Sequence, residues 1–167
     1  MYPSVFPDEI SGQILFPSRV GRAMTILDQL RRGVTTDSAE HTRALASGLA
    51  KALPATVTLA LHGDMGVGKT TFVQGLALGL GVAEWVTSPT FAIFSVHQGG
   101  ARTLVHLDAY RLENDHQIES LLLDDFLTSP YCLAVEWPEK ISAWLPADTW
   151  HLVLSIEEGD RHRVWLR

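Results

Sequence analysis

The chain has 167 residues, of which 46% are hydrophobic and 19% charged, which fits one globular domain with a sizeable core and excludes a disordered chain. Its formal net charge is −6, and this disfavours a protein that grips RNA or DNA across a whole face, because phosphate contacts need clustered positive charge. No apolar run reaches the length of a transmembrane helix and no secretion signal is evident, so we expect a cytoplasmic protein without a membrane partner.

Residues 1–35 are predicted to be an appendage to the domain that follows. The stretch MYPSVFPDEISGQILFPSRV is rich in proline and shows no sustained helical or strand period. This composition is compatible with a mobile segment or with one laid across the domain. A short helix fits residues 23–32, and Met24 is an alternative start of the chain. Residues 36–167 are expected to form the functional domain.

A helix, a strand and a second helix are predicted at the start of this domain. Asp37 can cap the first helix, with Glu40 at its third position, and apolar residues recur at helical spacing until Pro54. The apolar, β-branched run ATVTLALHG then predicts a buried strand. The following TTFVQGLALGLG predicts a helix that ends at Gly81. A glycine-rich loop lies between this strand and this helix.

The remaining elements alternate between strands and helices. Strands are predicted at 91–96, 103–107 and 132–135, a helix at 118–126, and a C-terminal hairpin with a turn at 157–160. Cys132, the single cysteine, lies in an apolar run and is expected to be a buried, inert thiol. The alternation indicates an α/β fold that is P-loop NTPase-like, with a mostly parallel sheet covered on both faces.

The glycine-rich segment GDMGVGKT fits the pattern Gly-x-x-x-x-Gly-Lys-Thr of a phosphate-binding loop. Gly63, Gly66 and Gly68 allow the backbone to turn several N–H groups onto one phosphate. Lys69 can place an ammonium between the β- and γ-phosphates, and Thr70 offers a hydroxyl to Mg²⁺. A chance match to the full pattern is expected in fewer than about one in a hundred such chains. The sequence therefore predicts that a nucleoside triphosphate binds here.

Two acids lie at the ends of predicted strands. Asp108 closes TLVHLD and Glu136 closes CLAVE. Ligands of parallel sheets bind at the carboxyl ends of the strands, so both acids could face the nucleotide. Glu136 is the better candidate for the Mg²⁺ side, and Asp108 could orient the attacking water or complete the metal shell. In the alternative, one of the two is an exposed strand-end residue.

The nucleotide is expected to be ATP, because no Asn-Lys-x-Asp base reader for guanine is present. Small-molecule kinases usually carry an arginine-rich lid over the acceptor. Here only Arg102 and Arg111 lie between the loop and the C-terminal tail. The sequence thus favours an ATPase with little substrate machinery of its own.

Three further stretches sharpen this interpretation: VTSPTF, HLDAYRL and EWPEK. Together with GDMGVGKTT, in this order and at similar spacing, they resemble the bacterial TsaE family, also known as YjeE. The resemblance covers about residues 36–167. It implies an ATPase, weak alone, that acts with the transferase subunits TsaD and TsaB in forming threonylcarbamoyladenosine in tRNA. ATP and Mg²⁺ are the implied cofactors, contact with tRNA is expected to be indirect, and no DNA partner is implied.

The resemblance also assigns the nucleotide site by matching positions. Lys69, Asp108 and Glu136 are the implied catalytic residues, and Thr70 and Glu136 the implied Mg²⁺ ligands. Trp137 either stacks near the nucleotide or covers the sheet edge. The implied ATP-binding residues, besides Trp137, are Gly63, Asp64, Met65, Gly66, Val67, Gly68, Lys69, Thr70 and Thr71.

Other matching positions leave two interpretations open. Ser88, Pro89 and Thr90 would form a switch-like loop near the γ-phosphate, or an ordinary Ser-Pro turn. Tyr110 and Arg111 could reach a partner or form a surface pair.

The chain departs from the family pattern in ESLLLDDF, where Leu122 or Leu123 stands at a position that is commonly glycine. Two alternative functions also remain: a small-molecule or nucleoside kinase, and a nucleotide-gated binding module.

Overall fold

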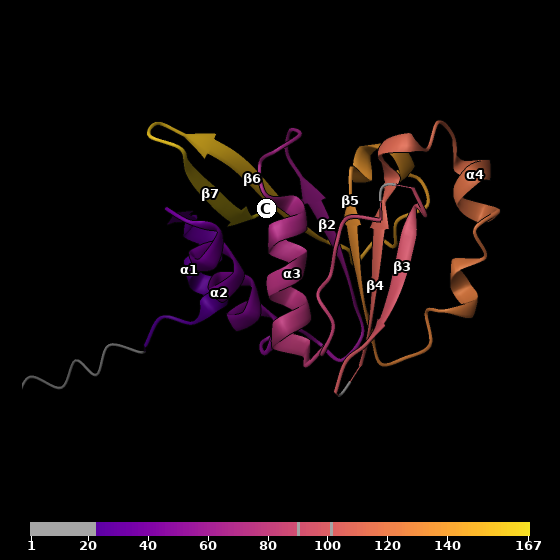
Figure 1. Cartoon of the computed structure of the whole chain (residues 1–167), viewed down its shortest axis with the longest axis horizontal. Coiled ribbons are helices and arrows are strands. Elements are labelled where there is room, and N and C mark those ends of the chain that lie inside the picture. Colours follow the sequence, from indigo (N-terminus) through magenta and orange to yellow (C-terminus); the bar gives the residue numbers. More distant parts are fainter. Residues whose placement is uncertain (1–22, 90, 101) are drawn as a thin grey trace, which may run out of the picture.

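The structure, a computed structural model, describes residues 23–89, 91–100 and 102–167, and its frame is one seven-stranded sheet (Figure 1). The strands lie in the order β1-β7-β6-β2-β5-β4-β3, with β6, β2, β5 and β4 parallel in the centre and antiparallel pairs toward both edges. The strands are β1 (Val34–Thr36), β2 (Val57–His62), β3 (Phe94–Gln98), β4 (Thr103–Asp108), β5 (Tyr131–Glu136), β6 (Trp150–Glu157) and β7 (Arg161–Leu166). The predicted α/β fold with a C-terminal hairpin is confirmed.

Helices cover both faces of this sheet, and the strand residues alternate between two cores. Leu104 and Ala134 belong to the core under α1, α2 and α3, whereas Val105 and Val135 belong to the core on the opposite face, with Ile118 of α4. Figure 1 shows α2 and α3 side by side on the first of these faces. The helices are α1 (Ile26–Arg32), α2 (Ala39–Ala50), α3 (Lys69–Leu80) and α4 (Asp115–Glu119), and the short 3₁₀ helices are η1 (Ala109–Arg111), η2 (Leu123–Asp125) and η3 (Pro138–Ile141).

The described part of the N-terminal segment packs on the domain. The short helix expected there is α1, which begins with a capping box between Thr25 and Asp28 and buries Leu30 completely. β1 then pairs with β7 through Val34 and Val164. The division of the chain at residue 36 stays a prediction, since residues 1–22 lie outside the described residues.

The N-cap expected for α2 is wrong. Ser38, not Asp37, caps the helix: its backbone is extended and its hydroxyl accepts from the His41 backbone N–H at 3.1 Å. The Asp37 carboxylate instead pairs with the His41 imidazole at 3.2 Å. Aspartate and serine are both good N-cap residues, so residue type alone does not distinguish Asp37 from Ser38. The extended backbone of Ser38 identifies it as the N-cap.

The strand predicted at 91–96 is displaced toward the C-terminus. β3 begins at Phe94 because the preceding Ile93 has a left-handed backbone (φ 69°) and its N–H donates to the Pro89 carbonyl at 2.7 Å. Residues 91–93 therefore form a turn, and Phe91 is left 88% exposed. The β-branched and aromatic residues that suggested a strand serve a tight turn instead.

The helix expected at 118–126 is also wrong. α4 ends at Glu119, and η2 follows only after Leu122, whose backbone is left-handed (φ 51°). Leu122 is one of the two leucines at which the sequence resemblance leads us to expect a glycine. A side chain in this backbone region costs roughly 1–2 kcal/mol, which explains why glycine suits the position.

Leu122→Gly is expected to stabilise the protein by about 0.5–1 kcal/mol, because it relieves the left-handed strain by more than the glycine costs in unfolded-state entropy. Little packing is lost, since Leu122 is 66% exposed. The matched control is Leu78→Gly, an exposed leucine inside α3, which should destabilise by about 1 kcal/mol. Chemical denaturation of the three proteins measures both shifts. A Leu122→Gly variant less stable than the parent would contradict the assigned backbone.

Cys132 behaves as expected from the sequence. It is completely buried in β5, and burial raises the pKa of its thiol to about 12. The thiol is therefore unreactive at neutral pH. Across the described residues, none of the helices combines the length and the apolar character that a membrane-spanning helix requires.

Candidate functional site

The glycine-rich loop joins the end of β2 to the start of α3. Gly63, Gly66 and Gly68 all have positive φ angles, of 137°, 80° and 98°. At Gly63 a side chain is also excluded by space, because an added Cβ would lie 2.4 Å from the Leu154 carbonyl oxygen. The loop is tied down at Val67, which is buried and whose carbonyl accepts a hydrogen bond from His162 Nδ1 at 2.8 Å. Contacts with β6 and β7 therefore hold the loop backbone at Gly63 and Val67.

Lys69 is the first residue of α3, and its side chain folds back over the glycine-rich loop. Its Nζ donates to the carbonyl oxygens of Gly63 and Asp64, at 2.6 and 2.9 Å, and lies 4.0 Å from the ring centre of Trp137. Burial lowers the pKa of the ammonium, and nearby carboxylates, Glu136 first among them, oppose this shift. Lys69 thus places a cation at the loop, where neutral acceptors and an aromatic face hold it.

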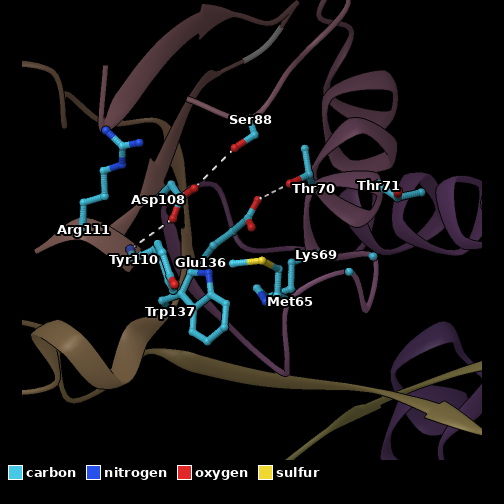
Figure 2. A pocket seen from close by; sticks show the side chains of 12 residues that line it. Met65, Lys69, Thr70, Thr71, Ser88, Asp108, Tyr110, Arg111, Glu136 and Trp137 are labelled. Atoms are coloured by element: carbon cyan, nitrogen blue, oxygen red, sulfur yellow. Dashed lines mark hydrogen bonds between the residues drawn. The ribbon is translucent and has the colours of Figure 1, made fainter. Parts of the chain in front are cut away.

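The two strand-end acids are neighbours. Asp108 and Glu136 are paired residues of the parallel strands β4 and β5, and both are at least nine-tenths buried. Thr70 Oγ1 donates to Glu136 Oε1 at 2.8 Å, and Ser88 Oγ donates to Asp108 Oδ2 at 3.3 Å. The backbone N–H of Tyr110 donates to Asp108 Oδ1 at 3.1 Å (Figure 2). Both carboxylates are therefore oriented by hydrogen bonds from other elements.

These groups line one pocket of about 440 Å³ (Figure 2). Most of the residues proposed from the sequence meet there. Gly63, Asp64 and Val67 lie in the loop without lining the pocket, Pro89 is buried and does not line it, and Thr90 is outside the described residues. The lining residues are Met65, Gly66, Gly68, Lys69, Thr70, Thr71, Ser88, Asp108, Tyr110, Arg111, Glu136 and Trp137.

Trp137 lines the pocket rather than only covering the sheet edge. Its backbone is left-handed (φ 58°), its ring faces Lys69, and it lies 5.0 Å from the ring of Tyr110. Arg111 extends along the same rim and stacks over the exposed Phe91 at 4.9 Å. An unfavourable backbone retained at a pocket is typical of functional sites.

One site residue was missed by the sequence reasoning. His106 is completely buried, and its Nε2 lies 2.9 Å from Glu136 Oε1. A histidine in an otherwise apolar strand, two residues before an acid, is the signal that could have found it, because residues at this spacing share one face of a strand.

The oxygen groups of the pocket fit a hard cation such as Mg²⁺. The Thr70 hydroxyl and the Glu136 carboxylate converge to 2.8 Å, and Mg²⁺ in phosphate sites takes one or two protein oxygens with phosphate and water completing the shell. Within the described ranges no cluster of three or more His, Cys, Asp or Glu side chains could hold a metal by itself. The donor set therefore suits a cation that arrives with a phosphate ligand.

A parallel strand, a glycine loop and a helix N-terminus, with acids at the ends of the neighbouring strands, define a P-loop NTPase-like α/β protein. The model of one family, described as "Threonylcarbamoyl adenosine biosynthesis protein TsaE", matches residues 36–164. The chain belongs to the TsaE family.

Individual relatives agree with this assignment. The chain is 38% identical over 129 residues to a protein of Bacillus subtilis, covering 77% of this chain and 80% of that one. It is 44% identical over 121 residues to a protein of Streptomyces coelicolor, covering 71% and 81%. Both relatives are named tRNA threonylcarbamoyladenosine biosynthesis protein TsaE. The crystal structure of Bacillus subtilis YdiB superposes with a TM-score of 0.65 at 32% identity, covering 80% of this chain and 82% of that chain.

Proposed function

We propose that the chain binds MgATP in the pocket described above and hydrolyses it slowly as the ATPase component of the cytoplasmic machinery that forms threonylcarbamoyladenosine in tRNA. One observation carries the proposal: Lys69, Thr70 and the two acids of neighbouring strands converge on a single glycine loop. The names of the relatives supply the pathway.

Each group has a role that its chemistry supports. The backbone N–H groups of the loop and the N-terminus of α3 would hold the phosphates, and the Lys69 ammonium would neutralise charge on the β- and γ-phosphates. Thr70 and Glu136 would hold Mg²⁺, which when bound withdraws charge from the phosphate oxygens. Asp108 would orient the attacking water, and Trp137 would contact the nucleotide.

Ser88, Pro89 and Thr90 would act as a switch-like loop. The Ser88 hydroxyl donates to Asp108, so a change at the γ-phosphate would be transmitted to Ser88 and Pro89. Partners that read this state would be the transferase subunits TsaD and TsaB, with tRNA contacted through them.

The first experiment is ATP hydrolysis by the purified chain, alone and with the TsaD–TsaB pair and tRNA. Low activity that rises with the partners supports the proposal. Turnover that is indifferent to the partners leaves an ATPase but removes the pathway, and phosphate transfer to a small acceptor would establish the kinase alternative instead.

Asp108→Asn is expected to reduce ATP turnover by about 10²-fold while ATP affinity stays within about threefold, because the variant keeps the size of the side chain but loses the charge that orients water. The matched control is Asp148→Asn, at an exposed aspartate far along the chain, which should leave turnover unchanged. Support of the transferase is measured in parallel. A turnover-deficient variant that still supports tRNA modification fully would favour a nucleotide-gated binding module over an ATPase.

A further inference from the structure

His106 makes one side-chain hydrogen bond within the described part of the chain. It is completely buried in β4, and its Nε2 lies 2.9 Å from Glu136 Oε1. An ionised carboxylate can only accept hydrogen bonds, so Nε2 carries the proton and donates. Among the described residues, Nδ1 is the one buried side-chain nitrogen or oxygen without a hydrogen-bond partner. The hydrogen bond to Glu136 is therefore the contact through which the imidazole can affect the site.

The contact fixes one particular oxygen of Glu136. Oε1 accepts from His106 on one side and from Thr70 Oγ1, at 2.8 Å, on the other. In the described part of the chain, every hydrogen bond of this carboxylate ends on Oε1. Two donors on one oxygen set the rotation of the carboxylate plane and leave Oε2 available to a ligand.

We infer that His106 is a positioning residue, which holds the Glu136 carboxylate in the orientation that Mg²⁺ binding with ATP requires. The inference rests on the proposed function. Partners that orient a metal-binding carboxylate typically change metal affinity or activity by about 10–100-fold when they are removed. The geometry assigns the same type of role here, since His106 is too deeply buried to reach the nucleotide.

Two amide substitutions separate this role from simple core packing. His106→Gln can place an amide N–H near the position of Nε2, whereas the shorter His106→Asn reaches only the position of Nδ1. Both put a polar amide into the same buried site, so they are matched in desolvation. Thermal unfolding of both variants shows whether each is folded.

The readout is the Mg²⁺ concentration at half-saturation when a fluorescent ATP analogue binds to the intact chain. His106→Asn is expected to raise it about 10–100-fold, with His106→Gln within about threefold of the parent. Affinity for the analogue in EDTA should stay within about threefold in both variants, because the loop contacts are untouched. Equal Mg²⁺ midpoints for the parent and a folded His106→Asn variant would overturn the inference and leave the proposed function intact. A parent chain without Mg²⁺-dependent ATP binding would overturn both.

A second test uses the unmodified chain, so its result does not depend on whether a variant folds. Nitrogen-15 NMR distinguishes the two tautomers of a neutral imidazole. His106 is expected to carry its proton on Nε2, and His162, which donates from Nδ1 to the Val67 carbonyl, serves as the internal control with the opposite tautomer. A neutral His106 imidazole with its only proton on Nδ1 would have no donor to Glu136 and would overturn the inference.

Discussion

Lys69→Ala is expected to lower kcat/KM for MgATP hydrolysis by at least about 10²-fold, the typical loss when one preorganised electrostatic contact is removed from a reacting group. Lys69 is only 4% exposed and lies at the start of α3, beside the loop that would hold the phosphates. It is the cation that the structure places inside the loop, and Arg111 reaches only the rim of the same pocket. Steady-state hydrolysis and ATP binding, measured together, show whether affinity or productive placement is lost.

Two controls isolate the charge of Lys69. Lys69→Met keeps an apolar stem against Trp137 but has no ammonium, so it should be as inactive as Lys69→Ala and closer to the parent in thermal stability. Lys51→Ala removes an exposed lysine at the end of α2 and should leave hydrolysis unchanged. Near-normal MgATP hydrolysis by either Lys69 variant would show that the loop does not bind phosphate as assigned.

Glu136→Gln is expected to reduce Mg²⁺-dependent turnover by about 10²-fold, because it removes the charge facing the cation while keeping an oxygen for Thr70 and His106. ATP affinity without Mg²⁺ should be unchanged or tighter, since repulsion between the carboxylate and the phosphates is lost. Titration of Mg²⁺ and binding of ATP in EDTA give the two quantities separately.

The amide variant is preferable to Glu136→Ala, which would leave the buried His106 N–H without an acceptor and cost about 1–3 kcal/mol of stability. Glu158→Gln, at an exposed carboxylate in the β6–β7 turn, is the matched control for the loss of one charge. If Glu136→Gln weakened ATP binding equally with and without Mg²⁺, Glu136 would not be a metal ligand, and Asp108 would become the candidate.

The strand–loop–helix unit was predictable because its signals are local. The apolar run of β2, the spacing of the loop glycines and the stop at Gly81 each depend on residues a few positions apart. The strand-end positions of Asp108 and Glu136 could be read for the same reason. The general geometry of parallel sheets predicted that both could face a ligand, whereas their side-by-side placement depends on β4 and β5 being neighbours.

Local signals failed at single residues whose backbone conformation the residue type does not specify. Ser38 and Asp37 are both good helix caps, and the apolar periodicity at 118–126 continues past the end of α4 at Glu119 and through the left-handed Leu122. Sequence patterns indicate which face of an element is apolar, but they do not reveal a single non-glycine residue with a positive φ angle.

By itself, the sequence determined the phosphate-binding loop, the α/β class and the family, because residue type and short spacing carry that information. Only the tertiary structure decided how Glu136 is held, since its partners Thr70 and His106 lie 66 and 30 residues away. Those contacts exist because the strand order places β5 between β2 and β4, beneath the start of α3. Strand order is set by the packing of the whole sheet, and no local pattern encodes it.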